Sequence, residues 1–295
     1  MNSSSSRLQS ILELNLSVFI MGNVTLFAKL LPFPATTIIL GRASIACIFL
    51  ALFLLLRAKS LKTKSFKDFL KIIGIGVLFG VHWATYFHSI QVSTVAIGML
   101  SLFTYPVFTA ILEPIFSGNR VDPFSFVLAL FAFFGLAIII PSFHWEDSSF
   151  QGVIWGLVSA VLYSLRNILT KEMHIHYSSA HLLCLQLFAT SLILIPFSEG
   201  LVAMMTNPTY LLYQILLAGL FTAFAHTLWI RSFSKLSVVT AGIFSTISPF
   251  YGILSAWFFL NEIPPERLWL GGGIILFCAI MEVMRTKKLA KTATN

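Results

Sequence analysis

The stretch SVVTAGIFSTISPFYGILSAWFFLNE, residues 237–262, decides the fold because the chain contains a second version of it. Residues 94–119 read TVAIGMLSLFTYPVFTAILEPIFSGN, and a shift of 143 positions places Pro106 on Pro249. The same shift aligns further positions in the preceding segments: Gly76 with Gly219, Tyr86 with Trp229, and Ser89 with Ser232. The sequence therefore predicts an internal duplication.

The composition restricts the chain to one broad class. Of 295 residues, 57% are hydrophobic and 10% are charged, whereas a soluble domain typically has about 25% charged residues. Because the repeated unit is itself apolar, a soluble solenoid is excluded. The net charge of +8 lies mostly in short loops and forms no basic stripe with interleaved aromatics, so we expect contact with membrane lipid and not with nucleic acid.

Apolar segments recur along the whole chain at a length of about 20 residues, which is what a helix needs to cross a bilayer. They are ten in number: 10–31, 34–56, 69–90, 94–116, 123–141, 151–171, 179–199, 209–232, 237–260 and 267–285. Five crossings per copy make the second copy enter the membrane from the opposite side. We predict an all-α integral membrane protein of ten transmembrane helices, built as two inverted five-helix repeats, 1–144 and 145–295.

The distribution of basic residues predicts the orientation. Of the 19 Lys and Arg residues, 15 fall on the side of the N terminus, two (Lys29 and Arg267) on the other side, and two (Arg42 and Arg166) within predicted spans. By the positive-inside rule both termini are cytoplasmic. We expect a multi-pass protein of the bacterial inner (cytoplasmic) membrane.

Two arginines lie inside predicted spans, where charge is costly and each ionisable residue is a functional hypothesis. Arg42 lies in the second segment and Arg166 in the inner third of the sixth. Each could contact the substrate directly, and Arg42 could bind a carboxylate group of the substrate. The alternative is a structural arginine that satisfies backbone carbonyls or extends toward the membrane surface.

Polar and aromatic side chains form matching stripes on the third and eighth segments: His82, Trp83, Tyr86 and Ser89 on one, Thr222, His226 and Trp229 on the other. An aromatic cavity with a few polar groups suits an amphipathic small molecule. His82 or His226 could also titrate near neutral pH and couple transport to protons. The alternative is a pair of hydrogen-bonded interhelical histidines in ordinary packing.

Three further features belong to the fourth and ninth segments. Glu113 is a candidate proton relay or a solvated helix end. Pro106 and Pro249 each remove a backbone hydrogen bond near the middle of a span, and freed carbonyls are tolerated in a membrane only beside protein or water. We expect both prolines to act as hinges or cavity walls, with Tyr105 adding a polar group.

The pattern resembles the EamA-type members of the drug/metabolite transporter superfamily in their ten-helix form. The residues that carry the resemblance are GNVTLFAK at 22–29, the Gly41–Arg42 pair, the stretch 92–106, and the quoted 237–262 with its proline followed by an acid 13 residues later. The first repeat departs from that pattern, because it has Asn119 at the position of the acid.

This resemblance implies a secondary carrier that works by alternating access. Helices one to four and six to nine would form the cavity, and helices five and ten would pack outside it. Family members move amino acids and related compounds, often outward, so we expect export of a small amphipathic metabolite. The run Gly271–Gly273 suggests close helix packing, with a homodimer face as one use of it.

Two other functions remain open at this point. An integral-membrane enzyme would need a catalytic constellation near the interface; His174 and His176 lie there, but they would point about 200° apart on a helix, and only Glu172 is a nearby carboxylate. A passive channel would need a filter motif. Since no metal or cofactor motif is found either, and the three cysteines are unpaired in the sequence, we expect no enzyme, cofactor or metal.

Overall fold

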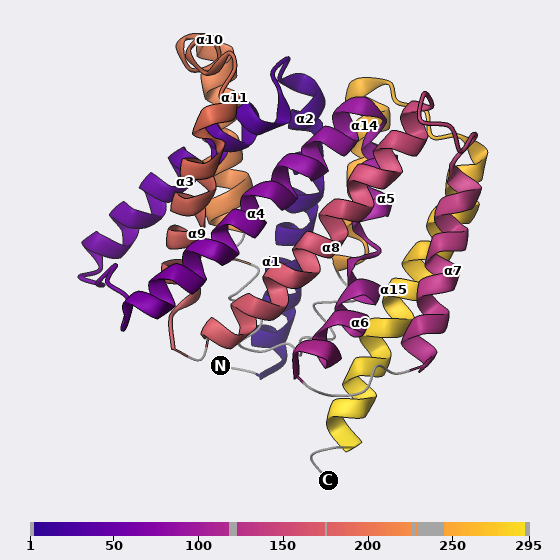
Figure 1. The fold of residues 1–295 in the computed structure, drawn as a ribbon, viewed down its shortest axis with the longest axis horizontal. Helices are drawn as coiled ribbons and strands as arrows, with labels where there is room; N and C mark the ends of the chain where they lie inside the picture. Colours follow the sequence, from indigo (N-terminus) through magenta and orange to yellow (C-terminus); the bar gives the residue numbers. More distant parts are fainter. Residues whose placement is uncertain (1–2, 118–122, 175, 226–227, 229–244, 293–295) are drawn as a thin grey trace.

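The computed structural model of this chain describes residues 3–117, 123–174, 176–225, 228 and 245–292. Within these residues, every regular secondary-structure element is a helix (Figure 1). Their bounds are α1 Ser3–Asn23, η1 Val24–Leu26, α2 Phe27–Leu30, α3 Ala35–Leu56, α4 Phe66–Val92, α5 Val95–Leu102, α6 Tyr105–Ser117, α7 Pro123–Ile139, α8 Ser148–His174, α9 Ser179–Leu194, η2 Ile195–Phe197, α10 Leu201–Thr206, α11 Pro208–Ala218, the π-helix η3 Gly219–Phe224, α14 Ser248–Leu260 and α15 Glu266–Thr292.

Every predicted span contains helix within the described part of the chain. Six helices there are long and apolar enough to cross a membrane: Ala35–Leu56, Phe66–Val92, Val95–Phe116, Ser148–Met173, Ser179–Phe197 and Glu266–Arg285. Shorter apolar helices at Pro123–Ile139, Pro208–Phe224 and Ser248–Leu260, together with α1, occupy the other four segments. The prediction of an all-α membrane protein is confirmed.

Local sequence explains where several helices begin. The Ser65 side chain accepts a hydrogen bond from the Asp68 N–H at 3.1 Å and so caps α4 three residues before the predicted span. Asn207 caps α11 in the same way, with Pro208 at its first position, where the missing N–H costs nothing. These caps lie at the ends of apolar segments, where backbone groups would otherwise lack partners.

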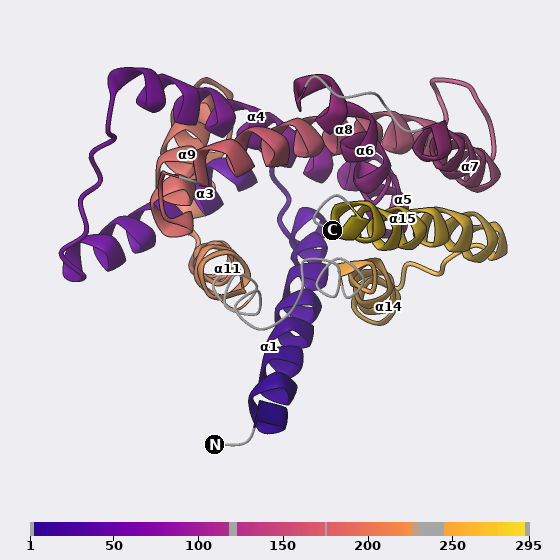
Figure 2. The same ribbon diagram turned by 90° about the horizontal axis from the view of Figure 1, so that it is seen from below.

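Helix α4 is the centre of the packing. It runs along α8 and α9, and α3 packs against α9, whereas α7 and α15 lie together at the opposite side of the molecule (Figures 1 and 2). A Cβ atom at Gly76 would lie 2.6 Å from the carbonyl oxygen of Gln186. Glycine therefore lets α4 and α9 approach to backbone contact.

The fourth and ninth spans contain a break where a kink is expected from the sequence. Helix α5 ends at Leu102 and α6 starts at Tyr105, so Pro106 is the second residue of a new helix. Pro249 has the same place in α14. Proline is favoured in the first turn of a helix, because no N–H is needed there. The two prolines therefore start helices and do not bend continuous ones.

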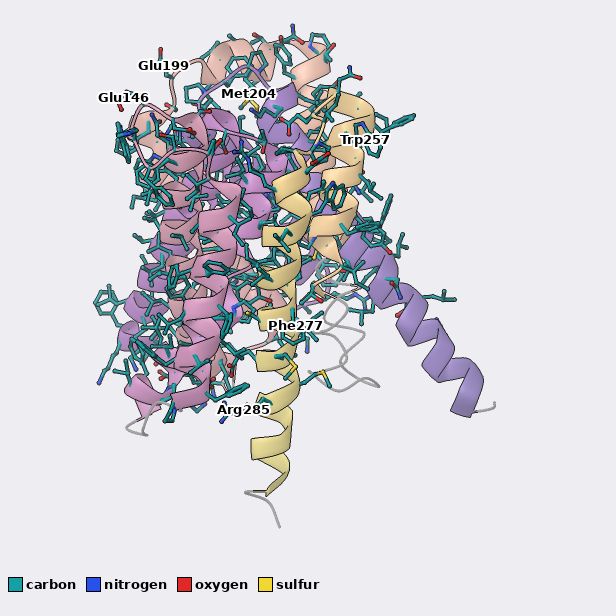
Figure 3. The ribbon with its side chains drawn as sticks, turned by 90° about the vertical axis from the view of Figure 1, so that its right-hand side faces the viewer. Glu146, Glu199, Met204, Trp257, Phe277 and Arg285 are labelled. Carbon is teal, nitrogen blue, oxygen red and sulfur yellow. The ribbon has the colours of Figure 1, made fainter. Side chains whose placement is uncertain are left out.

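The surface has apolar sides and polar ends. Leu52, Phe131 and Phe258 are among the large apolar side chains exposed on the helices, as lipid contact requires. Figure 3 shows Glu146 and Glu199 at one end of the molecule and Arg285 toward the other.

Candidate functional site

Helix α4 presents a buried aromatic face in the middle of the bundle. The Phe79 and Trp83 ring centroids are 4.2 Å apart, and the His82 and Tyr86 rings are nearly parallel with centroids 6.3 Å apart. Each pair is separated by four residues, which places its members on one side of a helix. The structure thus brings together three predicted site residues, His82, Trp83 and Tyr86, and adds Phe79.

His82 is held by α8. Its Nδ1 lies 2.8 Å from Ser159 Oγ and 3.1 Å from the Ser159 carbonyl oxygen, while Ser159 Oγ donates to the His82 carbonyl at 3.0 Å. The imidazole also stacks on Tyr163 with centroids 4.6 Å apart. Ser89, farther along the same stripe, donates to the Gly152 carbonyl of α8 at 2.6 Å. The side chains of His82 and Ser89 on the predicted stripe therefore connect α4 to α8 through hydrogen bonds and ring stacking.

Arg42 reaches this face from α3. Its side chain is buried, and its Cζ lies 3.9 Å from the centroid of the Trp83 ring. Its Nε donates to Thr222 Oγ1 at 2.8 Å. A guanidinium stacked on indole gains a cation–π attraction, which strengthens when water is excluded.

Thr222 lies in the π-helix η3, and the wider turn there explains its position. The Thr222 hydroxyl donates to the Leu217 carbonyl, five residues earlier, at 2.7 Å. π-helical turns are uncommon and occur frequently at functional sites. The turn places a hydroxyl group of the second repeat against an arginine of the first.

Arg166 approaches the same face from α8. Its Nε and Nη2 donate to Gln186 Oε1 at 3.1 and 2.6 Å, and its Nη1 donates to Asn167 Oδ1 at 3.1 Å. Its Cζ lies 4.2 Å from the centroid of the Phe79 ring. Arg166 therefore points into the helix bundle, and its partners are neutral amides.

Tyr105 and Pro249, the predicted residues at the helix breaks, both lie against neighbouring helices. The Tyr105 ring meets Tyr163 edge-on with centroids 4.9 Å apart, and Ser164 Oγ donates to the Tyr105 carbonyl at 2.9 Å. Tyr105 thus joins the His82–Tyr163 stack beside Pro106. Pro249 is buried, next to Ser248, whose Oγ donates to the Val18 carbonyl at 3.5 Å.

The two ion pairs found among the described residues lie near helix ends. Lys171 Nζ is 2.6 Å from Glu113 Oε1, and Lys29 Nζ is 3.8 Å from Glu262 Oε1. Glu113 is therefore ion-paired at a helix end. Lys29 and Lys171 each lie near the end of the first span of a repeat, so both of these spans end with a lysine that pairs with an acid from another part of the chain.

The sequence predicted the residues of α4 and the two arginines, but not the residues of α8 and α9 that contact them. His226 and Trp229 lie outside the described residues. Ser159, Tyr163 and Gln186 were not predicted as site residues. Their proximity to α4 depends on which helices are neighbours, and a single sequence does not specify this.

With this geometry in place, the family can be assigned. The profile of the EamA-like transporter family matches residues 9–140 and 150–284. The chain belongs to the EamA-like transporter family. It is a transporter and not an enzyme, as predicted, and the predicted resemblance is confirmed.

Several curated proteins are similar along most of the chain. The pseudopaline exporter CntI of Pseudomonas aeruginosa (strain UCBPP-PA14) is 23% identical over 257 residues, 86% of this chain and 88% of its own length. The riboflavin transporter of Vibrio cholerae is 25% identical over 266 residues, 86% of this chain and 85% of its own. A probable terminal-alkyne amino-acid exporter of Streptantibioticus cattleyicolor is 24% identical over 172 residues, 57% of each chain.

A solved crystal structure shares the fold. Its TM-score is 0.62 at 16% sequence identity, with 94% of this chain and 98% of the other covered. At that identity the likeness supports the fold alone. The relatives support a function in transport of small molecules.

Proposed function

We propose that this protein exports a small amphipathic metabolite, an amino acid or a related compound, by alternating access around the α4 cluster, the name used here for Phe79, His82, Trp83 and Tyr86 of α4 together with Arg42 and Arg166. One observation carries the proposal: α3 and α4 of the first repeat and α8, α9 and η3 of the second converge on one set of aromatic and cationic side chains. Transporters built from inverted repeats bind substrate near the middle of the membrane, where the two repeats meet.

The predicted site residues have distinct roles in this proposal. Trp83 and Tyr86 would pack against the apolar part of the substrate, and Arg42 and Arg166 would bind its charged part. Tyr105, His226 and Trp229 are proposed to complete the cavity. The break before Pro106 would act as a hinge, because it divides a span into two helices that can change their angle, and we propose the same role for the turn before Pro249.

Direction and location follow from the charge distribution and the relatives. Two of the relatives are named as exporters, and the basic ends of the chain favour cytoplasmic termini. We place the protein in a bacterial inner membrane on this basis. The glycine run of α15 has two kinds of surroundings: a Cβ atom on Gly135 of α7 would lie 2.8 Å from the Gly271 carbonyl oxygen, so Gly271 is used within the chain, whereas Gly273 has nothing within 4 Å and is the position we propose for a homodimer contact.

Flux into proteoliposomes tests the function. Purified protein would be reconstituted with a pool of labelled amino acids and small metabolites, with and without a proton gradient. Saturable flux that a competitor inhibits is expected, and it would distinguish a carrier from a channel. Linear, non-competable flux would contradict the proposal, as would loss of activity on replacing only His174 and His176.

The same assay tests proton coupling. If His82, His226 or Glu113 carries protons, accumulation should depend on the gradient and should lose that dependence in His82→Gln, His226→Gln or Glu113→Gln. Because Glu113 is ion-paired to Lys171 at a helix end, Lys171→Gln is the matched control. It breaks the ion pair and leaves the carboxyl group in place.

A further inference from the structure

Among the residues that the structure describes, neither arginine of the α4 cluster has an anionic partner. The eleven acidic residues are Glu13, Asp68, Glu113, Asp122, Glu146, Asp147, Glu172, Glu199, Glu262, Glu266 and Glu282. They lie in loops or near the ends of the apolar segments, and among the described residues none forms an ion pair with Arg42 or Arg166. Residues 226–244, whose structure is largely undescribed, contain no acid at all.

Two uncompensated cations inside a membrane protein carry a large free-energy cost. Desolvation of an unpaired charge costs several kcal/mol per ion even after relaxation, about as much as a typical protein's net stability allows. Intramembrane charges are retained mainly where they serve a substrate or ion path. The missing negative charge is therefore expected from outside the chain.

The hydrogen bonds of each arginine leave its charge available. Only Nε of Arg42 has an acceptor among the described residues, so both of its Nη groups remain unbonded there. Arg166 is oriented by the neutral oxygens of Gln186 and Asn167, which fix the guanidinium without neutralising it. A fixed guanidinium fork matches the two oxygens of a carboxylate.

The two guanidinium groups are close enough to bind one small molecule. Arg42 stacks on Trp83 and Arg166 on Phe79, and these two rings are adjacent on α4. The three centroid separations limit the distance between the two Cζ atoms to at most about 12 Å. Arg42 comes from the first repeat and Arg166 from the second, so one ligand would bridge both.

We propose, resting on the transport function above, that the substrate is a small organic dianion with two separated carboxylate groups on an apolar or aromatic body. One carboxylate binds Arg42 and the other binds Arg166. A monoacid would leave one intramembrane guanidinium without an anion and a neutral compound would leave both, and this would select against them.

Thermal stabilisation of the purified protein in detergent tests this without knowledge of the natural substrate. The probes are isophthalate with two carboxylates, benzoate with one, isophthalamide with none, and phenyl phosphate with a single dianionic group. A ligand that binds the folded state raises its melting temperature with concentration. Isophthalate should stabilise at concentrations about 10- to 100-fold lower than benzoate, and isophthalamide should have no effect.

Variants assign the effect to the two arginines. Arg42→Gln and Arg166→Gln should each weaken isophthalate to the level of benzoate. Arg42→Lys should retain part of the effect and serves if the glutamine variant does not fold. Arg57→Gln, in which an arginine outside the cluster loses the same charge, is the matched control and should match wild type.

The outcomes separate this inference from the transport function. Equal effects of benzoate and isophthalate, no effect of isophthalate, or stabilisation by phenyl phosphate alone would overturn it. So would saturable flux of neutral or monoacidic compounds that Arg42→Gln and Arg166→Gln leave unchanged. Failure of wild type to transport any dianion that stabilises it would instead count against the proposed function.

Discussion

Replacing Glu262 by glutamine should loosen the end of the bundle that contains Lys29. The Glu262 carboxylate lies 3.8 Å from Lys29 Nζ, and its other oxygen accepts from the Val95 N–H at 2.9 Å. That N–H belongs to the first turn of α5, where a negative charge is stabilised by the helix dipole. One carboxylate therefore connects α2, α5 and the loop before α15.

The magnitude follows from these two contacts. A carboxylate at a helix N terminus contributes about 0.3–1 kcal/mol, and a partly exposed ion pair about 0.2–1 kcal/mol. Glutamine keeps the hydrogen-bond acceptor and loses the charge. The closed end should lose about 0.5–2 kcal/mol, which corresponds to an open population about 2- to 30-fold larger.

Labelling of a buried reporter measures that population. Ala96 is buried and lines the same small cavity as Glu262, so Ala96→Cys in a background without the three native cysteines reacts with a maleimide only when this end opens. Glu262→Gln should accelerate labelling by the factor given above. Glu266→Gln, an exposed acid in the first turn of α15, is the control and should leave the rate unchanged. An unchanged rate in Glu262→Gln would refute the reasoning.

Three other predictions concern helix packing around α4 and one loop contact near its start. Gly76→Ala should lower stability by about 1–3 kcal/mol because its Cβ would meet a carbonyl oxygen of α9, whereas Gly74→Ala, with nothing within 4 Å, should not; thermal unfolding compares them. Ser159→Ala removes the hydroxyl that His82 contacts and should cost about 1–3 kcal/mol, measured in the same way; an unchanged midpoint would contradict that contact. Tyr177→Phe should speed tryptic cleavage in the loop 57–65, because the Tyr177 hydroxyl accepts a hydrogen bond from the Lys64 N–H of that loop and donates one to the Asp68 carboxylate of α4. Burial and the Asp68 carboxylate raise the pKa of Tyr177, so both hydrogen bonds should persist up to at least about pH 10.

The spans were predictable because each depends on local composition. The segment 34–56 is α3 almost to the residue, and 69–90 lies inside α4, whose extra turn depends on the Ser65 cap. The break between Leu102 and Tyr105 was not predictable in position, since a proline permits either a kink or a new helix start. Helix α10, Leu201–Thr206, lies between two predicted spans, and its six residues are too few for a periodic signal.

The site was predictable in its residues but not in its contacts. Helical spacing placed His82, Trp83 and Tyr86 on one face, and intramembrane charge singled out Arg42 and Arg166. Their partners required knowledge of which helices are neighbours. The contacts of Arg166 with Gln186 and Phe79, for example, join α8 to α9 and α4, and no local pattern encodes that.

The two terminal ion pairs differ in their exposure, and this difference has a consequence for the resting protein. The Lys29–Glu262 side chains are 25% and 21% exposed, whereas those of Lys171–Glu113 are 76% and 38% exposed. Water and salt screen the second pair more strongly, so it opens at lower cost. Two identical inverted copies would make the two access states equally populated. With these unequal closures, we expect the unloaded carrier to spend most of its time open toward the Lys171 end, which in the proposed topology is the side from which an exporter loads.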